Sequence, residues 1–196
     1  MESEEGLWLV QAQSGNTEAF SQLVERYQKP VYNLCYRMLG NAEDAEDAAQ
    51  ETFLRAYRSI RRYDSSRPFS TWLLSIAAHY CIDQMRRQRQ NVVSVEDLPV
   101  PDLVDETAGV ETSLVRKQEQ ERIRALLKTL DPTDRAAVIL YYWYDMSYAE
   151  ISQTLLLTES ALKSRLHRAR RSMAEQWMKA QATMALPGRL YEASTV

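Results

Sequence analysis

Residues 147–173, SYAEISQTLLLTESALKSRLHRARRSM, constrain most strongly what this chain can fold into. Ser147 followed three residues later by Glu150 forms a capping-box pattern, which predicts that a helix begins there. Thr158 is a suitable N-cap for a second helix. In that second helix, apolar residues recur at spacings of four, three and four residues: Leu162, Leu166, Ala169 and Met173. The pattern predicts two short helices joined by a tight turn.

The second of these helices also carries a basic side that is distinct from its apolar stripe. From Lys163 to Arg171 there are five Lys or Arg residues and no acid. A helix of this kind, preceded by a short capped helix, is typical of a helix-turn-helix that binds the major groove of DNA. A solvated amphipathic helix of a bundle has the same pattern, so this segment alone leaves both interpretations open.

Composition favours an all-α fold. Of 196 residues, 45% are hydrophobic and 26% are charged, and only five are Gly and six are Pro. These values are typical of a soluble globular protein. No segment shows the alternation of apolar and polar residues that an exposed strand would have. No run is apolar and long enough for a transmembrane helix or a cleavable signal peptide, so we expect a cytoplasmic protein.

Cys35 and Cys81 both lie within apolar helical patterns. Buried free thiols are therefore expected in preference to a disulfide. A redox switch formed by the two cysteines is the alternative.

Helical patterns cover both ends of the chain. In the first part they span residues 7–14, 17–39, 41–59 and 70–89, with Gly15 and Gly40 as stops and Asn41 as a cap. In the second part they span residues 112–130 and 132–144, where Asp131 and Pro132 mark a helix start, and then the two helices already described.

An acidic segment separates these two parts. Residues 91–115 contain six acids and no Lys or Arg, and residues 91–111 also have Pro, Gly and little periodicity. We therefore predict two small helical domains, at residues 1–90 and 112–182, joined by a flexible acidic linker at 91–111 and followed by a loose tail at 183–196. The net charge is −3, so any DNA-binding surface must be local.

Three segments in this order resemble the extracytoplasmic-function group of bacterial sigma factors, within the sigma-70 family. They are DAEDAAQETFLRAYRSI, RPFSTWLLSIAAHYCIDQMRR and MSYAEISQTLLLTESALKSRLHRARRSM. The resemblance covers about residues 19–89 and 123–173. It implies an N-terminal sigma-2-type helix bundle and a C-terminal sigma-4-type helix-turn-helix. It further implies a non-enzymatic initiation factor that binds core RNA polymerase and recognises the minus-ten and minus-thirty-five elements of promoter DNA.

The resemblance assigns polymerase docking to the acidic helix at 41–59, which would contact the coiled coil of the beta-prime subunit. The matching positions are Asp47, Gln50, Glu51 and Arg55. Acids near a helix N-terminus also interact favourably with the helix dipole. The dipole explains acids in the first turn but not Glu51 in the helix interior, so docking is the favoured interpretation. The beta flap is the second polymerase element expected to make contact.

The resemblance places a pocket for a captured minus-ten base in the loop at 61–68 and at the start of the next helix. Arginine and aromatic side chains in this region suit phosphates and stacked bases. Phe69 and Trp72 suit the core equally well, and His79 suits a packed or solvent-facing position. The candidate minus-ten residues are Arg61, Arg62, Tyr63, Arg67, Phe69, Trp72, His79, Arg86 and Arg87.

For the minus-thirty-five element, the resemblance points to the basic helix of the C-terminal pair. The candidates for groove contacts are Lys163, Ser164, His167 and Arg168. Three further residues suit either phosphates or salt bridges: Arg165, Arg170 and Arg171.

Two positions depart from the family pattern. Leu156 stands where the turn of the helix-turn-helix usually has Gly, so this turn must form without glycine. Ala78-His79 stands where Arg-Asn is common, so a different minus-ten preference is expected.

Two other functions remain open on the residues alone. A helix-turn-helix regulator would bind duplex DNA without polymerase, but it would have no use for QETFLRAY and RYDSSRPFSTW. An enzyme is disfavoured because neither a phosphate-binding glycine loop nor a nucleophile motif is evident, and His79 with Asp83 lacks further metal ligands. We therefore expect no cofactor, metal or small-molecule substrate, and family analogy suggests control by an anti-sigma factor.

Overall fold

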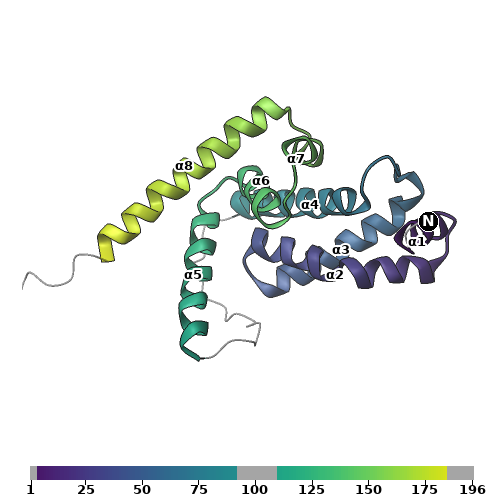
Figure 1. The fold of residues 1–196 in the computed structure, drawn as a ribbon, viewed down its shortest axis with the longest axis horizontal. Coiled ribbons are helices and arrows are strands. Elements are labelled where there is room, and N and C mark those ends of the chain that lie inside the picture. Colours follow the sequence, from purple (N-terminus) through teal and green to yellow (C-terminus); the bar gives the residue numbers. More distant parts are fainter. Residues whose placement is uncertain (1–3, 92–109, 185–196) are drawn as a thin grey trace, which may run out of the picture.

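The computed structural model describes residues 4–91 and 110–184, and these residues form helices and no strand, as the all-α prediction requires. The first bundle contains α1 (Glu4–Gln13), α2 (Thr17–Leu39), α3 (Ala42–Ser59), the short η1 (Ile60–Arg62) and α4 (Phe69–Asn91). The second contains α5 (Val110–Lys128), α6 (Pro132–Trp143), α7 (Tyr148–Leu155) and α8 (Glu159–Met184). Figure 1 shows α8 as a long helix at one end of the molecule and α1 at the other. Most of the predicted linker and tail lie outside the described residues.

Short polar caps and left-handed glycines set the helix ends of the first bundle. The Asn16 Oδ1 atom accepts a hydrogen bond from the backbone N–H of Ala19 at 3.1 Å and begins α2. Gly40 ends the same helix at φ 87°, a conformation that residues with a Cβ adopt only at a cost. The Asn41 Oδ1 atom then accepts from the backbone N–H of Asp44 at 2.7 Å and begins α3. These ends confirm the boundaries predicted for α2 and α3.

The two cysteines lie in the core of the first bundle, Cys35 on α2 and Cys81 on α4. Both are fully buried, and both are free thiols. A hydrogen bond with Cys35, together with burial, raises the pKa of the Cys81 thiol. A thiol with a raised pKa forms little of the reactive thiolate at neutral pH. The prediction of buried free thiols is confirmed.

The second bundle contains the predicted helix-turn-helix. The Ser147 hydroxyl accepts from the backbone N–H of Glu150 at 3.2 Å, and the Glu150 carboxylate accepts from the backbone N–H of Ser147 at 2.8 Å. This capping box begins α7, and the bonds to Ser147 lower the pKa of Glu150. The Thr158 hydroxyl accepts from the backbone N–H of Ala161 at 3.2 Å and caps α8. The predicted apolar stripe of α8 faces the core, with Leu162, Leu166 and Ala169 buried.

The turn between α7 and α8 is strained at Leu156. This residue has φ 55° and ψ 45°, in the left-handed region, and its side chain is 81% exposed. For a residue with a Cβ, this conformation costs roughly 1–2 kcal/mol. Because the side chain lies in solvent, its packing does little to offset that cost.

We expect Leu156→Gly to raise the free energy of unfolding by about 0.5–1 kcal/mol, because relief of the left-handed strain exceeds the extra backbone entropy that glycine loses on folding. Leu156→Ala is the matched control, since it removes the exposed side chain but keeps the Cβ. Urea unfolding of the three proteins measures both effects. Equal stability of the Gly and Ala variants would contradict the presence of strain.

The two bundles pack against each other, with α6 and α7 against α4 and with α5 and α6 against α2. The Nη1 atom of Arg135, which is buried, donates to the carbonyl of Met38 at 2.6 Å. Met38 lies in the last turn of α2, where carbonyls lack partners within the helix. Burial and the nearby Arg89 lower the pKa of Arg135 to about 10. A second hydrogen bond between the bundles runs from the Tyr144 hydroxyl to the carbonyl of Pro30 on α2, at 2.6 Å.

Candidate functional site

The residues predicted to dock on polymerase share one side of α3. Asp47, Gln50 and Arg55 are exposed and Glu51 is partly exposed, whereas the other side of the helix is buried. Their spacings of three and four residues place neighbouring side chains one turn apart. Leu54, a large apolar side chain on the same side, is 50% exposed. We call these five residues the α3 face.

Internal contacts hold part of the α3 face in place. The Nε atom of Arg55 lies 2.7 Å from the Glu51 carboxylate. The guanidinium of Arg55 also lies 4.8 Å from the centre of the Tyr80 ring on α4. The acid and the base are therefore oriented before any partner binds, which reduces the entropy lost on binding.

The loop at 60–68, which carries several predicted minus-ten residues, has a defined conformation. The backbone N–H of Tyr63 donates to the carbonyl of Ile60 at 3.0 Å, and its hydroxyl donates to the carbonyl of Arg67. Asp64 accepts from the backbone N–H of Ser66 at 2.9 Å. The loop also leaves three arginines exposed: Arg61, Arg62 and Arg67.

The aromatic residues of this region pack on one another. The Tyr63 ring lies 5.5 Å from the Phe69 ring and 5.1 Å from the Trp72 ring. Phe69 also meets Tyr27 of α2 edge-on at 5.3 Å. Tyr63 and Phe69 are 7% and 2% exposed, whereas Trp72 is partly exposed. In this conformation Tyr63 and Phe69 support the loop from inside, and Trp72 is the ring of the three most open to a base.

The other predicted minus-ten residues lie farther along α4. His79 is half-buried, and its Nδ1 atom donates to the carbonyl of Ser75 at 2.8 Å. Arg86 donates to the hydroxyl of Thr133 on α6 at 3.3 Å, while Arg87 is exposed. Arg89, which was not predicted, donates to the carbonyl of Leu130 at 3.0 Å. Arg86 thus joins the bundles in this arrangement, and contact with DNA would require its release.

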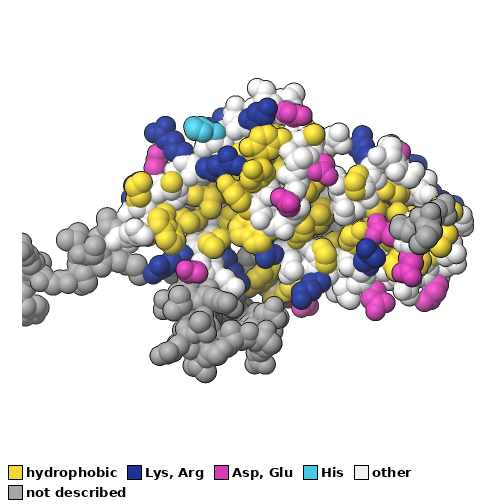
Figure 2. All heavy atoms as spheres, viewed as in Figure 1, with side chains coloured by type: hydrophobic (Ala, Val, Ile, Leu, Met, Phe, Trp, Pro, Cys, Tyr) yellow, Lys and Arg dark blue, Asp and Glu magenta, His cyan; other side chains and the backbone are white. Residues whose placement is uncertain are grey.

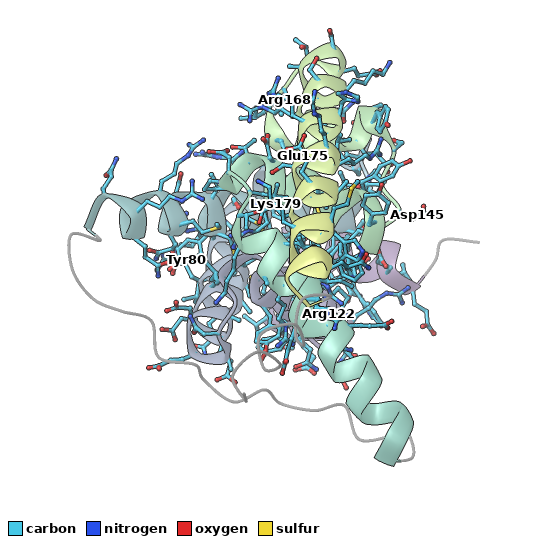
Figure 3. The ribbon with its side chains drawn as sticks, turned by 90° about the vertical axis from the view of Figure 1, so that its left-hand side faces the viewer. Tyr80, Arg122, Asp145, Arg168, Glu175 and Lys179 are labelled. Atoms are coloured by element: carbon cyan, nitrogen blue, oxygen red, sulfur yellow. The ribbon has the colours of Figure 1, made fainter. Side chains whose placement is uncertain are left out.

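The basic side of α8 divides into two groups. The residues predicted to enter the groove are all exposed and share the side of α8 opposite its buried stripe. Figure 2 shows Lys and Arg side chains along the upper part of α8, and Figure 3 shows Arg168 there. We call this group the α8 face: Lys163, Ser164, His167 and Arg168.

The three remaining arginines of α8 have partners within the protein, as does Lys163 of the α8 face, whose Nζ atom lies 3.9 Å from the Glu159 carboxylate. Arg165 pairs with the carboxylate of Asp134 on α6 at 2.6 Å. Arg170 lies over the Tyr141 and Tyr142 rings, 5.1 and 5.6 Å from their centres. Arg171 pairs with Glu175 at 2.8 Å. The sequence left phosphate contacts and salt bridges open for these residues. The structure shows salt bridges for Arg165 and Arg171, and ring contacts for Arg170.

An apolar groove of about 560 Å³ lies between α5 and the second half of α8. The groove was not predicted, although the apolar spacing of α8 continues beyond Met173 at Trp177, Ala180 and Met184. Trp177 and Leu126 supply its largest apolar surfaces, and the Arg122 guanidinium lies 5.9 Å from the Trp177 ring. Figure 3 shows Arg122 beside the lower part of α8. The other lining residues are Ala125, Thr129, Gln176, Ala180 and Gln181.

Residues 4–91 and 110–184 hold neither a cluster of metal ligands nor a membrane-spanning helix. Across these two ranges, the His, Cys, Asp and Glu side chains form no cluster of three or more that would hold a metal ion. None of the helices in these ranges is long and apolar enough to cross a membrane.

Comparison with protein families finds two matches, in the order that the sequence suggested. Residues 23–91 match Sigma-70 region 2, and residues 120–173 match Sigma-70 region 4. The first match covers most of α2 and all of α3, the loop at 60–68 and α4. The second covers the end of α5, all of α6 and α7, and the first part of α8.

Individual proteins give the same result over most of the chain. The chain is 34% identical over 175 residues to the ECF RNA polymerase sigma factor SigW of Bacillus subtilis, covering 86% of this chain and 94% of SigW. The structure resembles that of CnrH in complex with the cytosolic domain of CnrY, with a TM-score of 0.66, 26% identity, and coverage of 90% and 99%. It also shares its fold with the sigma factor RpoE from Bartonella quintana, solved with the anti-sigma factor NepR, with a TM-score of 0.63, 21% identity, and coverage of 80% and 94%.

Proposed function

Because the chain belongs to the extracytoplasmic-function sigma factors of the sigma-70 family, we propose that it binds core RNA polymerase and directs transcription from promoters with minus-ten and minus-thirty-five elements. The observation that carries this proposal is the presence of three separate exposed surfaces on one chain. They are the α3 face, the arginines of the loop at 60–68 and the α8 face.

The α3 face is the proposed docking surface for the coiled coil of the beta-prime subunit. Its ordered Glu51–Arg55 pair and the exposed Leu54 combine charge with apolar area, as protein interfaces commonly do.

The loop at 60–68 is the proposed site for the melted minus-ten strand. Its exposed arginines suit phosphates, and the partly exposed Trp72 suits a stacked base. Tyr63 and Phe69 take part by holding the loop and Trp72 from inside. His79 and Arg87 lie beyond the loop on α4 and would meet the DNA there, as Arg86 would after its release from Thr133.

The α8 face is the proposed reader of the minus-thirty-five element in the major groove. Side chains of the types found at Lys163, Ser164 and Arg168 form hydrogen bonds with base edges or phosphates. Arg165 and Arg170 contribute indirectly, because their contacts with Asp134 and the tyrosines fix α8 on α6. Arg171 lies on the exposed side of the helix, but it pairs with Glu175.

The second polymerase contact, with the beta flap, is assigned to the second bundle. The groove between α5 and α8 supports this assignment, because it is an open concavity with apolar walls away from the α8 face. Figure 2 shows hydrophobic side chains exposed over this part of α8.

Three further aspects of the proposal concern control, chemistry and location. We propose control by an anti-sigma factor, since RpoE, which has the same fold, was solved with one. We also propose that the chain acts in the cytoplasm, where core polymerase is found, and that it catalyses no reaction itself. Its role is instead to position polymerase on promoter DNA.

Run-off transcription with purified core polymerase across a promoter library tests the proposed function. We expect transcripts that depend on adding the chain and that start downstream of a shared pair of elements. A chain that binds duplex DNA but neither binds core polymerase nor supports transcription would instead be a conventional helix-turn-helix regulator.

A further inference from the structure

We propose that α1 belongs to the minus-ten apparatus, with Gln13 as the residue that positions the loop at 60–68. Helix α1 lies before residues 23–91, the segment that matches Sigma-70 region 2, so this match assigns it no role. The inference rests on the proposed function of the loop.

Gln13 bridges both ends of the turn that begins the loop. Its Nε2 atom donates to the carbonyl of Tyr63 at 2.8 Å and to the carbonyl of Ile60 at 3.3 Å. Between these carbonyls lie the exposed Arg61 and Arg62. One side-chain amide therefore holds the backbone on both sides of two proposed phosphate contacts.

The C-terminal end of α1 also lies against the side chain of Arg61. Gly15 follows α1 at φ 98°, and a Cβ at this position would lie 3.4 Å from the Nη2 atom of Arg61. Ala12 and Gly15 line a small pocket of about 240 Å³ together with Tyr57, Arg58, Ile60 and Arg61. The end of α1 thus contacts both the backbone of the loop and the side chain of one of its arginines, Arg61.

The other end of α1 supports the aromatic residues behind the loop. The Glu5 carboxylate accepts from the Tyr27 hydroxyl at 3.0 Å and pairs with Arg26 at 3.0 Å. Burial and Glu5 raise the pKa of Tyr27 to about 12, so this hydroxyl remains a donor at neutral pH. The Tyr27 ring packs on Phe69, and Phe69 packs on Trp72. One helix therefore supports the loop at Gln13 and the ring cluster at Glu5.

Loss of the Gln13 amide should loosen the loop without unfolding the bundle, because Gln13 is only partly buried and is not part of the apolar core. Since two hydrogen bonds are lost, we expect the preference for a matched over an altered minus-ten element to fall by about 5–150-fold. Affinity for core polymerase and dependence on the minus-thirty-five element should not change, because those surfaces lie on α3 and α8.

The experiment compares the full-length variants Gln13→Ala and Gln13→Glu with Gln11→Ala, an exposed control on the same helix. Gln13→Glu keeps the size of the side chain but removes both donated bonds. Trypsin cleavage after Arg61 and Arg62 reports how ordered the loop is. Run-off transcription on matched and altered promoters reports recognition of the minus-ten element. We expect both Gln13 variants, but not the control, to be cleaved faster and to discriminate less.

Two results would overturn the inference: unchanged cleavage in the Gln13 variants, or faster cleavage with full minus-ten discrimination. If the wild-type protein itself showed no minus-ten dependence, the proposed function of the loop would fail, while cleavage would still report whether Gln13 holds it. Hydrogen exchange at the hydrogen-bonded Tyr63 and Ser66 amides, measured on folded protein, provides the same readout of loop order should either variant be only marginally stable.

Discussion

We expect Glu51→Arg to lower the affinity of the chain for core RNA polymerase by about 30–5,000-fold. The substitution reverses a charge near the centre of the α3 face and destroys the 2.7 Å pair with Arg55. It also places two cations, the introduced arginine and Arg55, one turn apart. A basic group of the polymerase that pairs with the Glu51 carboxylate would then be repelled. Losing a well-placed charge contact at an interface typically costs about 2–5 kcal/mol, which corresponds to that range.

Binding of labelled full-length chain to core polymerase measures this effect. Glu25→Arg is the matched control, because it makes the same charge change at an exposed position on α2, outside the α3 face. Binding of duplex DNA by both variants shows whether the second bundle is intact. Unchanged core affinity in Glu51→Arg would remove Glu51 from the docking surface. An equal loss in Glu25→Arg would show that only net charge matters.

The second large effect is expected at the α8 face. We expect Arg168→Ala to reduce discrimination of the minus-thirty-five element by about 5–150-fold, because a good base contact contributes roughly 1–3 kcal/mol. Arg171→Ala should change discrimination by less than about 3-fold, since the exposed pair with Glu175 contributes little and is not aimed at a base. Each variant removes one positive charge from the exposed side of the same helix.

Run-off transcription on promoters with single substitutions in the minus-thirty-five element separates the two variants. Only Arg168→Ala should reduce the difference in transcript yield between matched and substituted promoters. Any loss common to both variants reports the general attraction of a cation to DNA, which weakens as salt rises. If Arg168→Ala weakened all promoters equally, Arg168 would be a phosphate contact and the assignment to base reading would be wrong.

Helix starts and the buried stripe of α8 could be predicted from the sequence because they depend on neighbouring residues. The caps at Asn41, Asp131 and Ser147 form as their side-chain chemistry requires. The buried residues Leu162 and Leu166 follow the same logic, since a repeat near 3.6 residues determines which side of a helix is apolar.

Contacts between distant segments could not be predicted in this way. The bond from Gln13 to Tyr63 spans 50 residues, and the bond from Arg86 to Thr133 spans 47. Gln13 and Arg86 each lie near the end of a helix, and no periodic pattern in the sequence indicates which distant residues they contact. Arginines on α8 illustrate the same limit, because only the packing of α6 against α8 pairs Arg165 with Asp134 and leaves Arg168 exposed.

Permanganate footprinting of promoter DNA tests the central claim most directly, because this reagent oxidises thymines in unpaired strands. With core polymerase and the full-length chain together, we predict reactive thymines in one region that includes the minus-ten element. Neither protein alone should produce them. Reactivity that is absent with both proteins present, while the chain still binds the duplex without polymerase, would contradict the account and identify a conventional DNA-binding regulator.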